Sequence, residues 1–519
     1  LPVVLTLSVN AAGRSKRFIT AVVLSTLLFC TLLYTKSRSG LVAFMVVDGI
    51  FWMLLVLKKI SWKHIRIPFM AIHLIFAVSI LITGIGVPTV DKWITIEGVK
   101  NQLVKTNQPT PQVAPVVAGP VLETGGTESG VIRKYVWQAA INVWKANPKN
   151  ILIGTGTETF AFAFYQYKPI GHNLTSEWDF LYNKAHNEYL NFLATTGLFG
   201  LASYLTLIGS VILWAVQYAR KTALVINVKK QPTVIDEGGI LIYGLTAGWV
   251  SLLITNFFGF SVVVTQLLFF LFPAAMLVVQ GTTQTKQWKK ETLMLRTQRI
   301  LLVLTLVGTI TAITLLSLSW FADKTFATGY RASRSGNYAS AYAPLGESVR
   351  LNRYVPLYHD EYAVVLSSLA LGAFESQDAT LAGTLAVYAL TENDNALRLS
   401  PNNVNFWKSR TKIFYALATI DEAYLPQAID ALIHAQTLSP SDPKISYNLA
   451  ILYGKLGDSQ KAMDYLLEAK RLKPNYRDAY YALSIFYTET KQPAKAKDII
   501  TQYLTTVDST DAEFKKLVE

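Results

Sequence analysis

Three side chains in the first 190 residues suit phosphate binding and proton transfer. Arg38 lies in a short polar turn, Arg133 begins an amphipathic helix, and His186 lies just before an apolar segment. Two guanidinium groups suit a diphosphate, because each matches phosphate oxygens in pairs and stays charged at ordinary pH. A histidine titrates near neutral pH and suits a general base. Lys134 and Lys184 flank these residues and add positive potential.

The composition places these residues in a membrane protein. The 519 residues are 51% hydrophobic and 16% charged, with a mean hydropathy of +0.30, whereas a soluble globular chain carries about 25% charged residues. Because apolar residues dominate and the Pro and Gly counts are ordinary, the composition excludes a disordered or collagen-like chain. The single cysteine, Cys30, excludes a disulfide framework and a multi-thiolate metal site.

The net charge of +14 is unevenly distributed along the chain. Residues 1–320 carry 27 basic and 12 acidic side chains, whereas residues 321–519 carry 21 basic and 22 acidic ones. Because the excess positive charge lies among membrane-length apolar segments, we expect a membrane and no nucleic acid as its partner.

Seven apolar segments approach or exceed the roughly 20 residues that a membrane span needs. They are residues 18–34, 41–57, 67–86, 190–217, 239–256, 260–280 and 300–320. Lys and Arg clusters, which mark the cytoplasmic side, occur before the first span and after the second, fourth and sixth. Threading the chain back and forth puts all four clusters on one side. The clusters are Arg14, Lys16 and Arg17; Lys58, Lys59, Lys63, His64 and Arg66; Arg220, Lys221, Lys229 and Lys230; and Lys286, Lys289, Lys290, Arg296 and Arg299.

This topology divides the chain into four parts. We predict transmembrane helices in 1–86, an extracytoplasmic loop domain in 87–189, further transmembrane helices in 190–320, and a second extracytoplasmic domain in 321–519. The loop opens with a Pro-rich linker containing Pro109, Pro111, Pro115 and Pro120, followed by an amphipathic helix that ends at Asn147-Pro148. The chain starts at Leu1 without a recognisable signal peptide, so we expect its natural start to lie upstream.

Residues 321–519 contain a repeat with a period of 34 residues. Pro440 and Pro474 lie 34 residues apart, and small residues recur between them where two helices would touch. This is the tetratricopeptide pattern, in which helix pairs stack into a solenoid whose groove usually binds a peptide or protein partner. A spacer or dimerisation arm is the alternative. The predicted fold is therefore all-α: a polytopic helical membrane domain followed by a soluble tetratricopeptide α-solenoid.

Three sequence blocks together resemble the O-antigen ligase and O-antigen polymerase family. The first is Thr35 to Gly40, which contains Ser37-Arg38-Ser39. The second runs from Arg133 to Phe160 and includes Asn147-Pro148 and Gly154-Thr155-Gly156-Thr157-Glu158-Thr159. The third runs from His186 to Leu201 and begins His186-Asn187-x-Tyr189-Leu190. The resemblance covers residues 15–280, and a tetratricopeptide tail is familiar in this family.

The resemblance implies a GT-C-like membrane glycosyltransferase that needs neither metal nor cofactor. Its donor would be a glycan on undecaprenyl diphosphate at the outer face of the bacterial cytoplasmic (inner) membrane. Its acceptor would be a hydroxyl of a lipid, a glycan or a protein, so ligation in lipopolysaccharide biosynthesis, polysaccharide polymerisation and protein O-oligosaccharyl transfer all fit.

The resemblance also implies roles for individual residues. The family's two arginines correspond to Arg38 and Arg133, with diphosphate binding as their implied role. Its loop histidine corresponds to His186, which would deprotonate the acceptor. Family members usually have several more spans before the first block, and this chain shows three before the loop, so we expect part of the donor groove to lie upstream of Leu1.

Other interpretations fit some of these residues. Taken alone, Arg38 suits a lipid headgroup contact and His186 an interfacial structural histidine, but their shared side of the membrane favours a joint role. A transporter of lipid-linked glycans would place charges along both halves of the bilayer, and the spans carry almost none. A membrane-anchored tetratricopeptide scaffold without catalysis leaves the three blocks unexplained.

Some polar residues near the site have a structural interpretation. We expect Gly154-Thr155-Gly156 to be a backbone turn rather than a phosphate loop, because it lacks the lysine that such a loop needs. Asp48, inside a span, is expected to pair across helices. His172 is a second loop histidine and the next candidate base. Three loop acids could bind a sugar or a metal, but they have no His or Asp partner at ligand spacing, so we expect them to be solvated: Glu158, Glu177 and Asp179.

Overall fold

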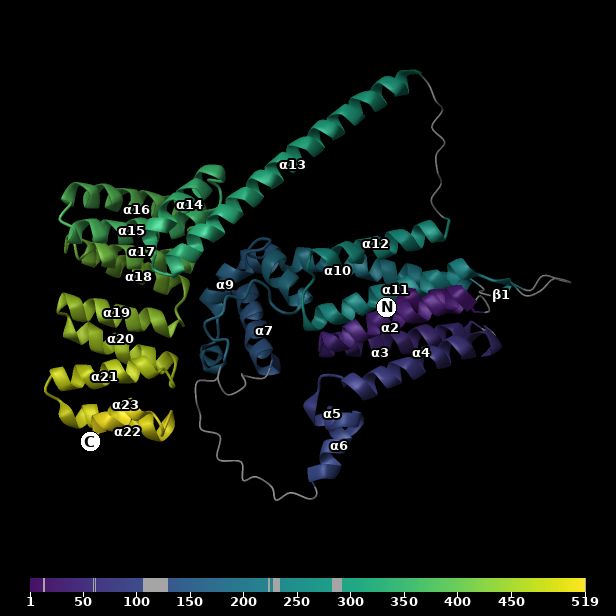
Figure 1. Ribbon diagram of the computed structural model, residues 1–519, viewed down its shortest axis with the longest axis horizontal. Coiled ribbons are helices and arrows are strands. Elements are labelled where there is room, and N and C mark those ends of the chain that lie inside the picture. The colour runs from purple at the N-terminus through teal and green to yellow at the C-terminus, as the bar shows by residue number, and fades with distance from the viewer. Residues whose placement is uncertain are drawn as a thin grey trace. The chain divides into compact units, whose positions relative to one another are not determined.

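The computed structural model describes residues 1–12, 15–58, 60, 62–105, 129–222, 225–226, 234–281 and 292–518. Within these residues the regular secondary structure is helical except for two short strands, β1 (Val225–Ile226) and β2 (Val234–Ile235), which pair antiparallel (Figure 1). The predicted all-α fold is confirmed. The Pro-rich linker lies outside the described residues. So do several members of the basic clusters, namely Arg14, Lys59, Lys229, Lys230, Lys286, Lys289 and Lys290.

The chain forms two compact units. The first draws on Leu1–Val116, Ala140–Phe160 and Asn183–Lys286, and the second on Val117–Ala139, Ala161–Tyr182 and Gln287–Glu519. The loop between the third and fourth predicted spans therefore contributes to both units. Its segments are α5 (Pro88–Ile94), α6 (Ile96–Lys105), α7 (Ser129–Lys145), α8 (Pro148–Ile153), α9 (Phe160–Tyr167) and the 3-10 helix η1 (Ile170–Leu174).

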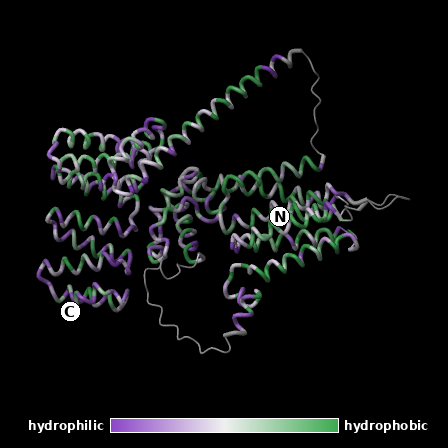
Figure 2. Tube along the Cα trace, in the orientation of Figure 1, coloured by the Kyte–Doolittle hydropathy of each residue, from purple (hydrophilic) through white to green (hydrophobic). Residues whose placement is uncertain are grey.

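Six described helices are long and apolar enough to cross a membrane, and they correspond to six of the seven predicted spans. The remaining predicted span, 260–280, forms the shorter α12 (Val263–Val279). Figure 2 shows hydrophobic residues along these helices. The six are α2 (Ser15–Tyr34), α3 (Arg38–Leu57), α4 (Trp62–Thr83), α10 (Glu188–Lys221), α11 (Glu237–Phe258) and α13 (Thr292–Arg334).

Contacts between helix ends show which of them lie together at one end of the first unit. Lys58, after α3, donates to the Thr222 carbonyl at the end of α10, with an Nζ–O distance of 3.0 Å. Asn10, at the end of α1 (Pro2–Asn10), donates to the Glu237 carbonyl at the start of α11 over 3.1 Å. Helix α11 packs against α1, α3 and α10. The starts of α3 and α10 therefore lie at the other end of this bundle, away from these contacts.

Aromatic rings and one polar link hold α2, α3 and α4 together. The rings of Phe29 and Phe76 stack with centroids 4.0 Å apart, and Phe44 packs 5.6 Å from Phe29. Asp48 on α3 accepts a hydrogen bond from Trp52 over 3.0 Å and contacts Nε2 of His73 on α4 at 2.9 Å. The prediction that Asp48 pairs across helices is confirmed.

The second unit is dominated by stacked helix pairs, as the tetratricopeptide pattern predicts. Helix α13 runs without interruption through the predicted domain boundary at residue 321 and packs against α14. Small residues such as Ala450, Ala462 and Ala469 are buried between helices. The stack comprises α14 (Tyr338–Leu351), α15 (Pro356–Glu375), α16 (Ala379–Leu399), α17 (Val404–Leu417), α18 (Tyr424–Leu438), α19 (Pro443–Leu456), α20 (Ser459–Leu472), α21 (Arg477–Glu489), α22 (Pro493–Thr506) and α23 (Ala512–Val518).

The predicted topology can be tested by labelling introduced cysteines. With Cys30 replaced by serine, a Ser340→Cys variant should react with a membrane-impermeant maleimide in intact cells, because the basic clusters predict an extracytoplasmic solenoid. Lys221→Cys is the matched control. Lys221 is exposed and lies on the predicted cytoplasmic side, so this variant should react only after permeabilisation. The reverse labelling pattern would show that the predicted orientation is inverted.

Candidate functional site

Arg38 occupies the first position of α3. The Ser37 side chain caps this helix by accepting a hydrogen bond from the Gly40 amide, with an N–O distance of 3.1 Å. The Arg38 side chain is exposed. The start of a helix carries partial positive charge and unpaired backbone N–H groups, which favour anions. The exposed guanidinium group and the helix start therefore attract an anion to the same place.

His186 lies directly before α10 in an unusual backbone conformation. Its φ angle is +53°, in the left-handed region that costs a residue other than glycine about 1–3 kcal/mol. The neighbouring residues hold this conformation: Asn187 caps α10 by accepting from the Leu190 amide over 3.0 Å, and Asn191 accepts from the Ala185 amide over 3.4 Å. These contacts fix the direction from which the half-buried imidazole leaves the backbone.

The His186 ring packs against an aromatic residue that the sequence did not indicate. The ring of Phe260, just after α11, lies 5.2 Å from the imidazole at an interplanar angle of 83°. The next residue, Ser261, donates its amide hydrogen to the Glu188 carboxylate over 3.3 Å. The turn after α11 thus supports the start of α10 and limits the rotation of the histidine ring.

Two glycines bring the second and third sequence blocks into backbone contact. Gly154 has a φ of +69° at the end of α8, and Gly197 has a φ of +63° where α10 is interrupted. A Cβ added to Gly154 would lie 2.2 Å from the carbonyl carbon of Thr195, and one added to Gly197 would lie 2.4 Å from that of Leu152. The Gly156 amide donates to the Thr195 carbonyl over 2.8 Å. The segment forms a backbone turn, as predicted.

The structure gives different surroundings to the two predicted accessory lysines. Lys184 forms an ion pair with Glu158, and its side chain is 19% exposed. Lys134 is exposed on α7, beside the half-buried Arg133. The pairing with Glu158 reduces the positive charge that Lys184 offers to a ligand, whereas the charge of Lys134 faces solvent.

The candidate residues divide between the two units. Arg38 and His186 lie at the same end of the first unit, opposite the contacts made by Lys58 and Asn10. Arg133 belongs to the second unit. The convergence of Arg133 with Arg38 on one diphosphate therefore stays a prediction.

His172 is enclosed by aromatic rings. The ring centroids of Tyr135, Phe164 and Tyr182 lie 6.3, 5.5 and 5.4 Å from that of His172, which is fully buried. Burial, reinforced by the charge of Lys168, lowers the pKa of His172 to about 4. The imidazole is therefore neutral at physiological pH, and its enclosure suits a packing role better than contact with an acceptor.

All three loop acids have a polar partner, and that of Glu158 is Lys184. Glu177 accepts a hydrogen bond from the Tyr182 hydroxyl, and Asp179 forms an ion pair with Lys444 of the solenoid. Glu158 and Asp179 are exposed, as expected of solvated loop acids, whereas Glu177 is half-buried. In the described ranges, no group of three His, Cys, Asp or Glu side chains lies close enough to hold a metal ion.

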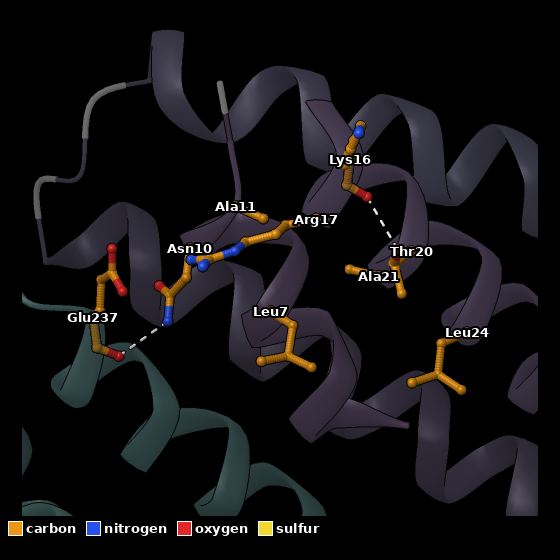
Figure 3. Close-up of a pocket in the computed structure, with 9 residues that line it drawn as sticks. All are labelled: Leu7, Asn10, Ala11, Lys16, Arg17, Thr20, Ala21, Leu24 and Glu237. Atoms are coloured by element: carbon orange, nitrogen blue, oxygen red, sulfur yellow. Dashed lines mark hydrogen bonds between the residues drawn. The ribbon is translucent and has the colours of Figure 1, made fainter. Parts of the chain in front are cut away.

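A cavity of about 420 Å³ lies at the opposite end of the first unit from the candidate site (Figure 3). Arg17 extends over it toward Asn10, whose side-chain amide is bonded to the Glu237 carbonyl. Because α2 starts here and ends beside Arg38, this cavity is separate from the candidate transfer site. Its lining residues are Leu7, Asn10, Ala11, Lys16, Arg17, Thr20, Ala21, Leu24 and Glu237.

The fold and the site define a helical membrane protein joined to a tetratricopeptide solenoid. Residues 23–205 match the family described as O-antigen ligase, and residues 443–476 match the tetratricopeptide repeat. This similarity to O-antigen ligase supports a membrane glycosyltransferase-like role. No curated protein sequence matches the chain.

Similar solved structures are tetratricopeptide proteins. MamA 41-end from Desulfovibrio magneticus RS-1 is 19% identical, with 37% of this chain and 97% of that chain covered and a TM-score of 0.29. A thermophilic tetratricopeptide protein from Thermus thermophilus, TTC0263, is 17% identical, with 38% and 95% covered and a TM-score of 0.29. The Pseudomonas aeruginosa protein pilF is 17% identical, with 39% and 82% covered and a TM-score of 0.29.

Proposed function

We propose that this protein transfers a glycan from undecaprenyl diphosphate to an acceptor hydroxyl at the outer face of the bacterial cytoplasmic membrane. One observation carries the proposal: Arg38 and His186 lie at the same end of a helical bundle whose sequence matches O-antigen ligase. The starts of α3 and α10 add partial positive charge at that end. This combination suits an anionic lipid donor and a proton-accepting histidine.

The proposed reaction assigns each residue a step. The acceptor oxygen attacks the anomeric carbon of the donor sugar, and its proton passes to the imidazole of His186. As the new glycosidic bond forms, the bond between the anomeric carbon and the diphosphate oxygen breaks. Arg38 and Arg133 stabilise the negative charge that develops on the leaving undecaprenyl diphosphate. The glycan and the proton are both accounted for without a metal or cofactor.

A transfer assay on the purified protein tests this function. The protein would receive a glycan-labelled undecaprenyl diphosphate together with a lipid, glycan or peptide acceptor. We expect labelled product and free undecaprenyl diphosphate, at the same rate with and without a chelator. Donor binding without transfer to any of the three acceptor classes would contradict the proposal and favour a scaffold or a transporter.

Mass analysis of cells identifies the acceptor class. Cells with and without the full-length protein would be compared for surface glycans and for glycan attached to proteins. Loss of glycan from a lipid core indicates a ligase, shortened chains indicate a polymerase, and loss of protein-bound glycan indicates an oligosaccharyltransferase.

A further inference from the structure

A segment of the extracytoplasmic loop is docked on the tetratricopeptide solenoid. We call residues 165–179 the docking segment. It contacts the turns between successive helix pairs, namely the connection between α18 and α19 and that between α20 and α21. Both the docking segment and these turns belong to the second unit.

Asn173 bonds to both turns with a single side chain. Its Nδ2 donates to the carbonyl oxygens of Ser441 and Leu472, over 2.8 and 3.0 Å. Lys473 donates in return to the carbonyl of Asn173 over 2.8 Å, and the Ser441 hydroxyl donates to the carbonyl of Lys168 over 3.1 Å. Asn173 is fully buried and Ser441 is 7% exposed. Water is therefore excluded from this network, and its donors depend on the docked arrangement.

Aromatic and charged contacts flank the network. The Trp178 ring lies 6.1 Å from that of Tyr476, and the ammonium group of Lys473 lies 4.7 Å from the Trp178 centroid. Asp179 forms an ion pair with Lys444. Burial lowers the pKa of Lys473 to about 8, as expected for a cation removed from water. Tyr165 joins the buried cluster of α17, α18 and α19.

These contacts show that this surface of the solenoid is not an unoccupied binding surface for another protein. The hydrogen bonds reach backbone carbonyls of two consecutive repeats and are made by a side chain with no exposed area. This surface of the solenoid is already filled by the protein's own chain.

We propose that the solenoid acts as an intramolecular clamp that holds the docking segment, and that transfer requires the loop to be held in this way. Asn173 and Lys473 are positioning residues, because they act through the loop rather than on the substrate. The partner of these two solenoid turns is residues 165–179 of the same chain. The effect on transfer rests on the proposed function, whereas the docking itself does not.

The full-length protein carrying Asn173→Ala tests the clamp by hydrogen–deuterium exchange and by transfer. Two buried carbonyls lose their donor, so we expect amide exchange in 168–179 to rise about 10- to 100-fold. We expect kcat to fall by about tenfold or more while the donor Kd stays unchanged, since misplacing a catalytic group lowers the rate without removing donor contacts. Lys473→Met should reproduce both changes from the solenoid side.

The matched control is Asn393→Ala. Asn393 is equally buried in the same solenoid, donates to Asp360 and accepts from Arg410, all away from the loop. We expect it to leave exchange in 168–179 and transfer unchanged. An equal loss of transfer in this control would assign the effect to solenoid stability and overturn the clamp.

A charge exchange provides a second test that does not disturb a buried group. Asp179 and Lys444 are both about two-fifths exposed, so their variants should fold. Asp179→Lys should reduce transfer about two- to fivefold by placing two cations together, and the double variant Asp179→Lys/Lys444→Asp should restore it.

Wild-type transfer by Asn173→Ala despite faster exchange would overturn the positioning role and leave the proposed function intact. Absence of transfer by the unmodified protein would overturn the proposed function, while exchange would still decide the docking.

Discussion

Replacing His186 with alanine should reduce glycan transfer by about 100- to 10,000-fold, the range that general base catalysis contributes. Asn187 and Asn191 hold the backbone beside His186 and Phe260 packs on its ring, so the substitution removes a preorganised proton acceptor. Binding of undecaprenyl diphosphate should stay near its normal value, because the proposed diphosphate contacts come from arginines. The variant should therefore lose kcat and retain donor affinity.

Single-turnover transfer and donor-binding assays on the same preparations separate these two quantities. His434→Ala is a matched control, because this histidine is exposed on the solenoid and packs against Trp407 with ring centroids 3.9 Å apart and an interplanar angle of 38°. It should transfer normally. If His186→Ala transferred glycan at a rate close to that of the unmodified protein, His186 would have no place in the mechanism. His172 would then be the next candidate base, although its enclosed ring would need to become exposed to reach an acceptor.

The membrane helices were largely predictable because a bilayer imposes a minimum length on an apolar segment. Helix α12 follows α11 after only a short turn and ends at Val279, so its 17 residues form a shorter helix than the predicted span. The boundary at residue 321 was less predictable. Helical spacing continues from the apolar half of α13 into its polar half without a proline, so the sequence contains no local signal to end the helix.

The chemistry-bearing residues were identifiable, but the contacts that support them were not. Arg38 and His186 lie in recognisable sequence blocks. Phe260 lies 74 positions after His186, and nothing in its local sequence indicates that its ring packs on the imidazole. The docking of Asn173 is harder still, because its acceptors lie 268 and 299 residues away. An asparagine in a loop has many possible partners, and only the folded chain selects among them.

Substituting Arg38 with lysine should weaken donor binding about tenfold, and substituting it with alanine should weaken it about 100-fold. Hydrogen bonds to charged groups contribute about 1.5–3 kcal/mol, and each 1.4 kcal/mol changes an affinity tenfold. Lysine retains the charge but cannot place two donors on two phosphate oxygens. The exposure of Arg38 at the capped start of α3 leaves its guanidinium group available to a donor lipid.

Lys36→Asn is the matched control for charge in the same turn. Lys36 is exposed with a φ of +50°, a conformation that asparagine tolerates, so the variant removes one cation without backbone strain. It should change donor affinity much less than Arg38→Lys does. An unchanged donor Kd for Arg38→Lys would instead support the interpretation of Arg38 as a lipid headgroup contact.

A double-mutant cycle then asks whether Arg38 and Arg133 bind the same diphosphate. If both guanidinium groups contact one diphosphate, the losses in donor affinity for Arg38→Lys and Arg133→Lys should not add in the double variant. Lys134→Ala, which removes the exposed neighbour of Arg133 on α7, provides the reference for a residue that contributes only long-range potential. Additive losses would mean that the arginines bind separately. Non-additive losses, with His186 still needed for turnover, would place donor binding on the arginines and proton transfer on the histidine.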